Sequence, residues 1–205
     1  AGDMAIPKGT WYGNIFVMLR QLLVFTKPIT NQIFDGGVNL YCGMLAVLTM
    51  FLYLFVKEHP WKKFRKYVLL VLLVISFNHG TLNYIWHGMH DQYGIPNRFS
   101  FVFIFVLLVM AYDAVQSITE IDIYFVISST LLAGAFAFAC KQQAGATIGK
   151  YTLPASLVLL VIYGVTCCLR TSKKITHATY ISVIGSVCLV ELVANAAYGF
   201  SENGY

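Results

Sequence analysis

Long apolar runs, separated by short polar stretches, make up most of the chain. The first run occupies residues 38–56, and later runs occupy residues 99–115, 121–140, 152–169 and 175–196. A transmembrane helix needs about 20 consecutive, mostly apolar residues, and these runs have that length or come close to it. The pattern therefore predicts a series of helices that cross a membrane.

One further run is apolar over only half the required length. It begins near Tyr67, and polar side chains appear from Asn78 onward, among them His79 and Asn83. Because unpaired polar groups are costly in lipid, the outer half of this predicted helix must face protein or water. With this helix, the sequence predicts an all-α integral membrane protein with about six transmembrane helices in a domain over residues 38–196.

Two segments flank this domain. Residues 1–37 contain a shorter apolar patch at residues 15–25, which Arg20 and Gln21 interrupt. At that length the patch predicts an interfacial or re-entrant helix rather than a span. We expect residues 1–37 to form an extracytoplasmic or interfacial segment and residues 197–205 to begin a second extracytoplasmic one. Since the chain starts without Met and stops just after its last apolar run, we also expect a fragment of a longer protein.

Basic residues are concentrated in two of the connecting stretches. Five of the ten residues 57–66 are Lys or Arg, and three more lie within residues 170–174. Alternating spans place both stretches on one side, and the excess of positive charge predicts that this side is cytoplasmic. Residues 79–98 and 141–151 would then lie outside the membrane.

Composition narrows the class of protein further. Hydrophobic residues make up 58% of the chain and charged residues 11%, so a soluble domain of this size could not cover its apolar surface. The net charge of +5 does not indicate nucleic-acid binding, because the basic residues lie between apolar runs rather than along one polar face. We expect membrane lipid, and no nucleic acid, as a partner.

The polar stretch that follows the second apolar run holds the main candidate chemistry. If the second helix continues through it, three polar side chains share one face because they recur every four residues: His79, Asn83 and His87. Trp86 and His90 share a neighbouring face. Since Asn and His can hydrogen-bond sugar hydroxyls and Trp can stack on a sugar ring, the stretch predicts a sugar or substrate site. The alternative is an aromatic belt whose polar groups are satisfied by neighbouring helices.

Two polar residues near the end of the last run extend this prediction. Glu191 and Asn195 are four residues apart and therefore share a helix face. We expect them to contribute to the same substrate site. The alternative for Glu191 is a structural ion pair with Arg98 or Lys150.

Arg98 is the candidate for binding a phosphate group. Asn97 is a favoured N-cap residue, so the third span is predicted to begin at Arg98, just after Pro96. Because N–H groups at a helix start and a guanidinium both bind phosphate oxygens, Asn97 and Arg98 predict a lipid-phosphate site. The alternative is an arginine that merely extends to lipid headgroups.

A metal site is the weaker interpretation of the same region. His87, His90 and Asp91 lie close together in the sequence, but they do not form an HExxH arrangement. The sequence therefore predicts neither a metal site nor a cofactor.

Four segments, taken in order, resemble the bacterial YfhO family. They are Asp35-Gly-Gly-Val-Asn-Leu-Tyr-Cys-Gly43, Leu82-Asn-Tyr-Ile-Trp-His-Gly88, Pro96-Asn-Arg-Phe-Ser-Phe101 and Glu191-Leu-Val-Ala-Asn195. The resemblance implies a GT-C-type glycosyltransferase in the bacterial cytoplasmic membrane. Such an enzyme transfers a sugar from undecaprenyl phosphate, a polyprenyl-phosphate donor, to a cell-surface polymer such as lipoteichoic acid on the outer face. The resemblance also implies a catalytic carboxylate in an external loop before Ala1, so no catalytic residue is named.

Two functions of other classes compete with the glycosyltransferase. A transporter or flippase half would place its site near the membrane midplane, on broken helices or inverted repeats. A non-catalytic membrane scaffold would need no polar cluster. The predicted polar residues gather at the outer ends of the helices, which favours the enzyme.

Overall fold

The computed structural model describes residues 9–29, 37–90, 97–144 and 149–202. In this part of the chain every regular element is a helix, and strand pairing is limited to one isolated bridge between Trp11 and His79. The elements are α1 (Ile15–Leu19), η1 (Arg20–Leu22), α2 (Met44–Leu52), η2 (Tyr53–Phe55), α3 (Pro60–Asn78), α4 (Gly80–Trp86), α5 (Ser100–Gln116), η3 (Ile118–Glu120), α6 (Ile123–Ala144), α7 (Thr152–Thr171) and α8 (His177–Glu202). For these residues the prediction of an all-α protein is confirmed.

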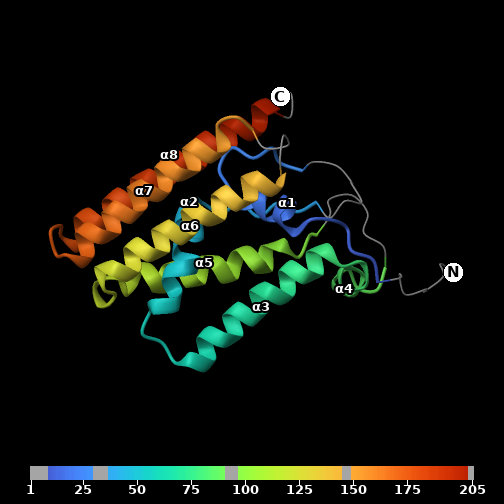
Figure 1. Cartoon of the computed structure of the whole chain (residues 1–205), viewed down its shortest axis with the longest axis horizontal. Coiled ribbons are helices and arrows are strands. Elements are labelled where there is room, and N and C mark those ends of the chain that lie inside the picture. Colours follow the sequence, from blue (N-terminus) through green and yellow to red (C-terminus); the bar gives the residue numbers. More distant parts are fainter. Residues whose placement is uncertain (1–8, 30–36, 91–96, 145–148, 203–205) are drawn as a thin grey trace.

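The long helices form a bundle with α3 at one side and α8 at the other (Figure 1). α2 packs against α5, α6 and α7, and buried side chains from these helices make up the core. α3 contacts α5, while α8 contacts α7. α2 is therefore central although it is short, and α8 is peripheral although it is long.

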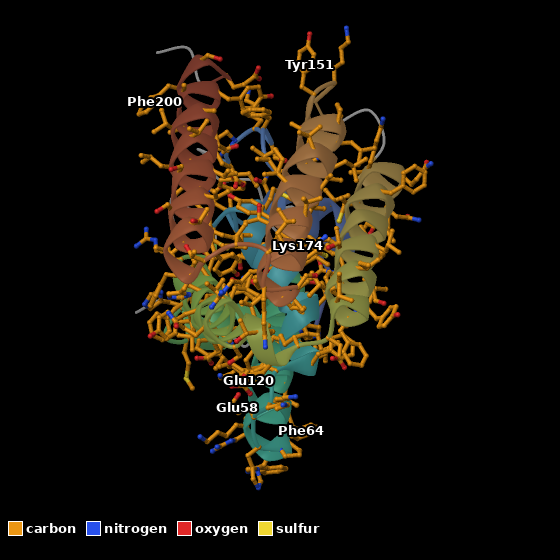
Figure 2. All side chains as sticks on the ribbon, turned by 90° about the vertical axis from the view of Figure 1, so that its left-hand side faces the viewer. Glu58, Phe64, Glu120, Tyr151, Lys174 and Phe200 are labelled. Atoms are coloured by element: carbon orange, nitrogen blue, oxygen red, sulfur yellow. The ribbon has the colours of Figure 1, made fainter. Side chains whose placement is uncertain are left out.

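The two strongly basic stretches lie at the same end of the bundle, which we call the basic end. There Lys57 Nζ lies 4.0 Å from Glu120 Oε2, and the Thr171 hydroxyl donates to the Ile118 carbonyl at 3.0 Å. Figure 2 shows Lys174 at this end of the α7–α8 pair and Tyr151 at the opposite end, where α4 also lies in Figure 1. We call the opposite end the α4 end. Which side of a membrane each end faces stays a prediction.

Three of the described helices are long and apolar enough to cross a membrane, namely α6, α7 and α8. Two shorter apolar helices, Met44–Phe55 and Ser100–Gln116, fall below that length. α3 has 19 residues, but its first two turns are strongly basic. The structure thus supports three candidate spans, and the predicted count of six is not confirmed.

The first predicted span differs most from the observed structure. Residues 38–43 are not helical, and α2 begins only at Met44. Gly43, with φ 104°, sits at the N-cap and has no side chain to cap the helix. The run at residues 38–56 therefore begins with six non-helical residues before it turns into a helix.

The N-terminal apolar patch forms a short helix that packs into the bundle. The Asn14 side chain caps α1 by accepting a hydrogen bond from the Phe16 N–H at 2.9 Å. Leu22, Leu23 and Val24 are buried, and α1 contacts α6. A helix is thus present within residues 15–25, while its interfacial or re-entrant placement in a membrane stays a prediction.

The basic end is held together by a charged cluster around Lys66, which we call the Lys66 network. Lys66 Nζ lies 2.8 Å from Asp113 Oδ2 and 3.4 Å from Glu58 Oε2, and it donates to the Tyr53 hydroxyl at 2.5 Å. The Tyr53 hydroxyl also donates to Glu58. Lys66, Glu58 and Asp113 keep 23%, 21% and 33% of their side-chain surfaces exposed. This network therefore joins η2, α3 and α5 close to solvent.

Candidate functional site

The predicted second helix is interrupted at His79. α3 ends at Asn78, His79 is extended (φ −118°, ψ 118°), and α4 begins at Gly80. The N-terminal chain binds the break: the Tyr12 N–H donates to the Asn78 carbonyl and the Gly80 N–H to the Thr10 carbonyl, each at 2.9 Å. The expectation that His79 shares one helix face with Asn83 and His87 is therefore wrong, because residues far upstream satisfy the backbone at this point.

Asn83 and Asn97 bind each other inside the protein. Both side chains are buried, and the Asn83 amide donates to Asn97 Oδ1. The Asn97 amide in turn donates to the Gly37 carbonyl at 2.8 Å. These two asparagines thus fix the end of the α3–α4 segment to the approach to α5 and to the segment that leads into α2.

Asn97 does not cap α5 as predicted. The helix begins at Ser100 with Phe99 as its N-cap, and Asn97 adopts a left-handed backbone with φ 53°. Its side chain is engaged with Asn83 and Gly37 instead, which explains why the local capping signal fails. Arg98, which is exposed, lies two residues before α5 rather than at its first position.

His87 and Trp86 lie against the start of α5. The Trp86 ring stacks on Phe99 at a centroid distance of 5.1 Å, and the His87 ring meets Phe99 edge-on at 5.7 Å. His87 Nδ1 is 2.9 Å from the Asn83 carbonyl. Since a carbonyl only accepts, Nδ1 carries the proton and Nε2 of the neutral ring is an acceptor. Nε2 is buried and has no hydrogen-bond partner among the described residues.

The two remaining histidines of the predicted site, His79 and His90, do not contact Phe99 as Trp86 and His87 do. His79 packs edge-on against Trp11 at 5.0 Å, and its Nδ1 is buried without a hydrogen-bond partner in the described part of the chain. His90 is exposed beyond α4. Asp91, the third member of the metal alternative, lies outside the described residues. Within those residues, no three His, Cys, Asp or Glu side chains are arranged to hold a metal.

Glu191 is the centre of a buried network that joins α8 to α7 and α2, which we call the Glu191 network. Glu191 is 3% exposed, and its carboxylate accepts three hydrogen bonds of 2.6 Å, from the Tyr41 hydroxyl, the Tyr163 hydroxyl and the Met44 N–H. Met44 is the first residue of α2, so this carboxylate supplies the cap that Gly43 cannot. Within the described residues no Lys, Arg or His forms a salt bridge with Glu191, so the alternative of an ion pair with Arg98 or Lys150 is not formed there.

Asn195 lies one turn further along α8 and binds backbone. Its Oδ1 accepts a hydrogen bond from the Phe25 N–H at 2.7 Å, while the Thr152 hydroxyl of α7 donates to the Phe25 carbonyl, also at 2.7 Å. Phe25 has a left-handed backbone with φ 55°. α7 and α8 together therefore hold the end of the N-terminal segment between them.

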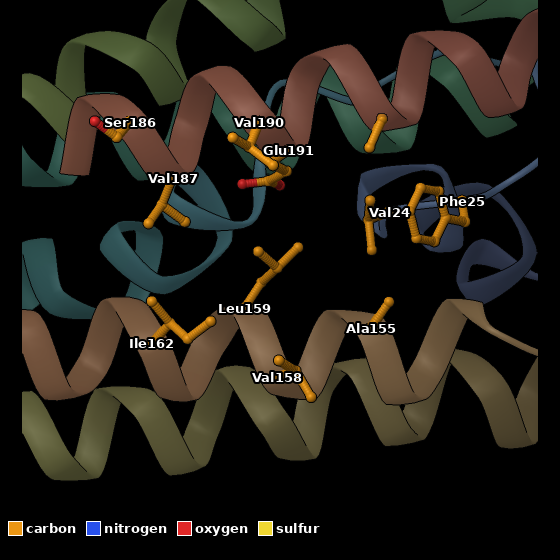
Figure 3. A pocket seen from close by; sticks show the side chains of 11 residues that line it. Val24, Phe25, Ala155, Val158, Leu159, Ile162, Ser186, Val187, Val190 and Glu191 are labelled. Carbon is orange, nitrogen blue, oxygen red and sulfur yellow. The ribbon is translucent and has the colours of Figure 1, made fainter. Parts of the chain in front are cut away.

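A cavity of about 420 Å³ opens between α7 and α8, next to both of these residues (Figure 3). Its walls are almost wholly apolar, with side chains from α7, α8 and the N-terminal segment. The lining residues are Val24, Phe25, Ala155, Val158, Leu159, Ile162, Ser186, Val187, Val190, Glu191 and Ala194. The sequence analysis missed this cavity, because only small residues at positions 155 and 194 hint at it.

The predicted site residues thus fall into two groups at the α4 half of the bundle. Trp86 and His87 contact Phe99, which directly follows the exposed Arg98 in the chain, while Glu191 and Asn195 lie beside the α7–α8 cavity. The segment that begins at Gly37 links them, since Gly37 accepts from Asn97 and Tyr41 donates to Glu191.

Comparison with known proteins places the chain in a family. No curated protein and no solved structure matches it with statistical significance. The family model described as bacterial membrane protein YfhO matches residues 9–205, which is nearly the whole chain. The protein therefore belongs to the YfhO family of bacterial membrane proteins.

Proposed function

We propose that the protein is part of a membrane glycosyltransferase. It would transfer a sugar from a polyprenyl-phosphate donor, such as undecaprenyl phosphate, to a cell-surface polymer of the lipoteichoic acid kind. Family membership supports the membrane location. The observation that carries the proposal is the contact of Trp86 and His87 with Phe99, directly after the exposed Arg98, at one end of the bundle.

These three side chains have the chemistry that a lipid-linked sugar requires. His87 Nε2 is a buried acceptor without a protein partner in the described residues, so a sugar hydroxyl would bind it once the side chains that cover it are displaced. One face of the Trp86 ring is covered by Phe99 and the residue as a whole is 40% exposed, which leaves surface for stacking on a sugar. The guanidinium of Arg98 can bind two phosphate oxygens at once.

The buried asparagines hold this group in position. Asn83 and Asn97 connect α4 to the segment that leads into α5, and His87 and Arg98 lie on these two connected parts of the chain. We assign them a positioning role, because their side-chain groups are engaged with each other and with Gly37. The catalytic carboxylate is not assigned to any residue of this chain.

The α4 end would face the outside of the cell in this proposal. Basic residues in connecting stretches favour the cytoplasmic side, and the two strongly basic stretches lie together at the opposite end. The donor would then be bound at the outer leaflet.

A transporter is the second candidate, because the break between α3 and α4 at His79 makes a discontinuous helix. The backbone groups at this break are, however, bonded to the backbone of Tyr12 and Thr10, and the Asn78 side chain is bonded to the backbone of Gly13, so these groups are not open to a substrate. This engagement favours the transferase.

Sugar transfer by the purified full-length protein, with a labelled polyprenyl-phosphate sugar as donor, tests the proposal. Loss of a hydrogen bond to a charged group is worth about 1.5–3 kcal/mol, so we expect Arg98→Ala to weaken donor binding at least about tenfold. Arg98→Lys should restore only part of this, since an ammonium is not bidentate. We expect His87→Ala to reduce transfer about tenfold by removing one acceptor.

Lys141→Ala is the matched control, because Lys141 is an exposed cation in the last turn of α6 at the same end of the bundle. It should leave transfer unchanged. Normal transfer by folded Arg98→Ala and His87→Ala proteins would remove this group from the substrate site. Uptake of a polyprenyl-linked sugar into vesicles without transfer to an acceptor would favour the transporter.

A further inference from the structure

The cavity between α7 and α8 has the form of a binding site for an apolar chain. Its volume of about 420 Å³ lies within the range of roughly 300–1,000 Å³ typical of small-molecule sites. In Figure 3, α8 and α7 form its two long walls, and Val24 and Phe25 lie between the two helices at one end. Two hydrogen bonds fix Phe25 at this end of the cavity, from the Phe25 N–H to Asn195 and from the Thr152 hydroxyl to the Phe25 carbonyl. A third, from Tyr163 to Glu191, fixes the carboxylate in the cavity wall. The cavity is thus built into the fold rather than left by loose packing.

The mouth of the cavity opens on the outer surface of the bundle, between the exposed sides of α7 and α8. Val158 of α7 and Val190 of α8 line the cavity and are 58% and 68% exposed. Both helices are candidate membrane spans, so the medium outside the mouth is the hydrocarbon of the bilayer. A lipid chain can therefore enter from the side without crossing water.

The single carboxylate in the cavity wall does not call for a polar ligand. Both oxygens of Glu191 are already bonded, to Tyr41, to Met44 and to Tyr163, each at 2.6 Å. A hydrocarbon chain can pass Glu191 without leaving any of these groups unpaired.

A cation lies just beyond the Phe25 end of the cavity. Lys150 precedes α7 and is exposed, with its ammonium 5.5 Å from the centre of the Tyr151 ring. The preceding residue, Gly149, lies against this end of the cavity, since a Cβ there would come within 3.5 Å of the Phe25 carbonyl oxygen. Lys150 is therefore placed where the headgroup of a lipid would emerge from the cavity, and its charge complements a phosphate.

We propose that the α7–α8 cavity binds one acyl chain of an anionic phospholipid whose headgroup phosphate lies at Lys150. The cavity volume suits a single chain of ordinary length. The inference does not rest on glycosyl transfer, because it uses only the shape, the surroundings and the charge of this site. It implies that the lipid forms part of the contact surface between α7, α8 and the N-terminal segment.

Photolabelling of the full-length protein in vesicles tests this assignment. The probe is phosphatidylglycerol with a diazirine in its acyl chain, in a background of phosphatidylcholine. In the unmodified protein we expect label on cavity residues such as Leu159 and Val187, above that on the lipid-facing Val193. Ala194→Phe fills the cavity and should abolish this excess. Ala196→Phe, two residues away and therefore on the opposite, exposed side of α8, is the matched control and should retain it.

The headgroup is tested with Lys150→Glu, paired with Lys141→Glu as a control at another helix end. One lysine near a membrane contributes about 1 kcal/mol, so Lys150→Glu should reduce the preference for phosphatidylglycerol over phosphatidylcholine by about fivefold or more. The control should keep the preference.

Ala155→Leu provides a second, smaller filling variant if Ala194→Phe does not fold.

Three results would overturn the assignment. One is label on Leu159 and Val187 no stronger than on Val193 in the unmodified protein. A second is equal labelling by phosphatidylglycerol and phosphatidylcholine. The third is displacement of the label by polyprenyl phosphate but not by excess phosphatidylglycerol, which would identify the occupant as a polyprenyl lipid.

Discussion

The Glu191 and Lys66 networks balance charge in different ways at different places in the bundle. Glu191 is 3% exposed and is held by three uncharged donors. Lys66 lies near the basic end, with 23% of its side chain exposed, and is balanced by the carboxylates of Glu58 and Asp113. The deep charge thus depends on fixed hydrogen bonds, and the shallow one on ions that water also reaches.

This difference follows from the cost of removing charge from water. A second ion at the depth of Glu191 would have to be desolvated as well, and the gain from pairing often fails to offset that cost. Hydroxyl and N–H donors are less costly to bury, and the start of α2 adds its favourable dipole. At the basic end, water and salt weaken the ion pairs of Lys66. They also solvate a charge that has lost its partner, so breaking a pair there costs little.

The comparison of the Glu191 and Lys66 networks assumes that the basic end and the α4 end of the bundle face opposite sides of a membrane. We expect Tyr151→Cys to react fully with a membrane-impermeant maleimide added to intact cells. Ser172→Cys should react only after permeabilisation, because it lies at the basic end. The unmodified protein is the control for its five native cysteines. Reversed labelling would put the Lys66 network outside and exclude the proposed outer-face sugar site.

Breaking the Glu191 network should have the largest effect on stability. Glu191→Leu leaves three buried donors without an acceptor, and each costs about 1–3 kcal/mol, so we expect a loss of about 3 kcal/mol or more. Thermal unfolding in detergent micelles would show this as a lowered Tm. Glu191→Gln keeps one acceptor oxygen and should lose less. Val193→Leu, on the exposed face of α8, should be neutral, and an equal loss in that variant would show that α8 is merely sensitive to substitution.

Breaking the Lys66 network should have a smaller effect that depends on salt. Partly exposed ion pairs contribute little, so Lys66→Met should cost about 1 kcal/mol. The difference from the unmodified protein should shrink at high salt, whereas the effect of Glu191→Leu should not. Lys62→Met, an exposed position on the same helix, is the control. A loss after Lys66→Met as large as that of Glu191→Leu would contradict the comparison.

Local sequence patterns were sufficient to predict the three long apolar helices that are candidate spans. The runs at residues 121–140, 152–169 and 175–196 are close to the observed α6, α7 and α8, because length and hydropathy alone determine such helices. The all-α class and the gathering of the basic stretches at one end follow from the same pattern.

Long-range contacts explain where the sequence predictions fail. α2 begins at Met44 because a carboxylate 147 residues away caps it. The helix breaks at His79 because residues 10–13 bind the chain there, and Asn97 is diverted from capping by Asn83. The spacing of Glu191 and Asn195 predicted a shared face, but their partners on other elements could not be identified from that spacing. The cavity has no sequence signature, since it is a space between elements rather than a property of either helix.

The position of Glu191 also fixes how α8 is aligned along α7. Apolar side chains on a membrane helix pack about as well against lipid as against each other, so they do not strongly select one axial position. A slip of one helical turn would move the Glu191 carboxylate by about 5.4 Å. It would then be out of reach of Tyr163, Tyr41 and the start of α2, all of which it contacts at 2.6 Å in the observed alignment. One buried carboxylate thereby sets the register of the longest helix in the described part of the chain.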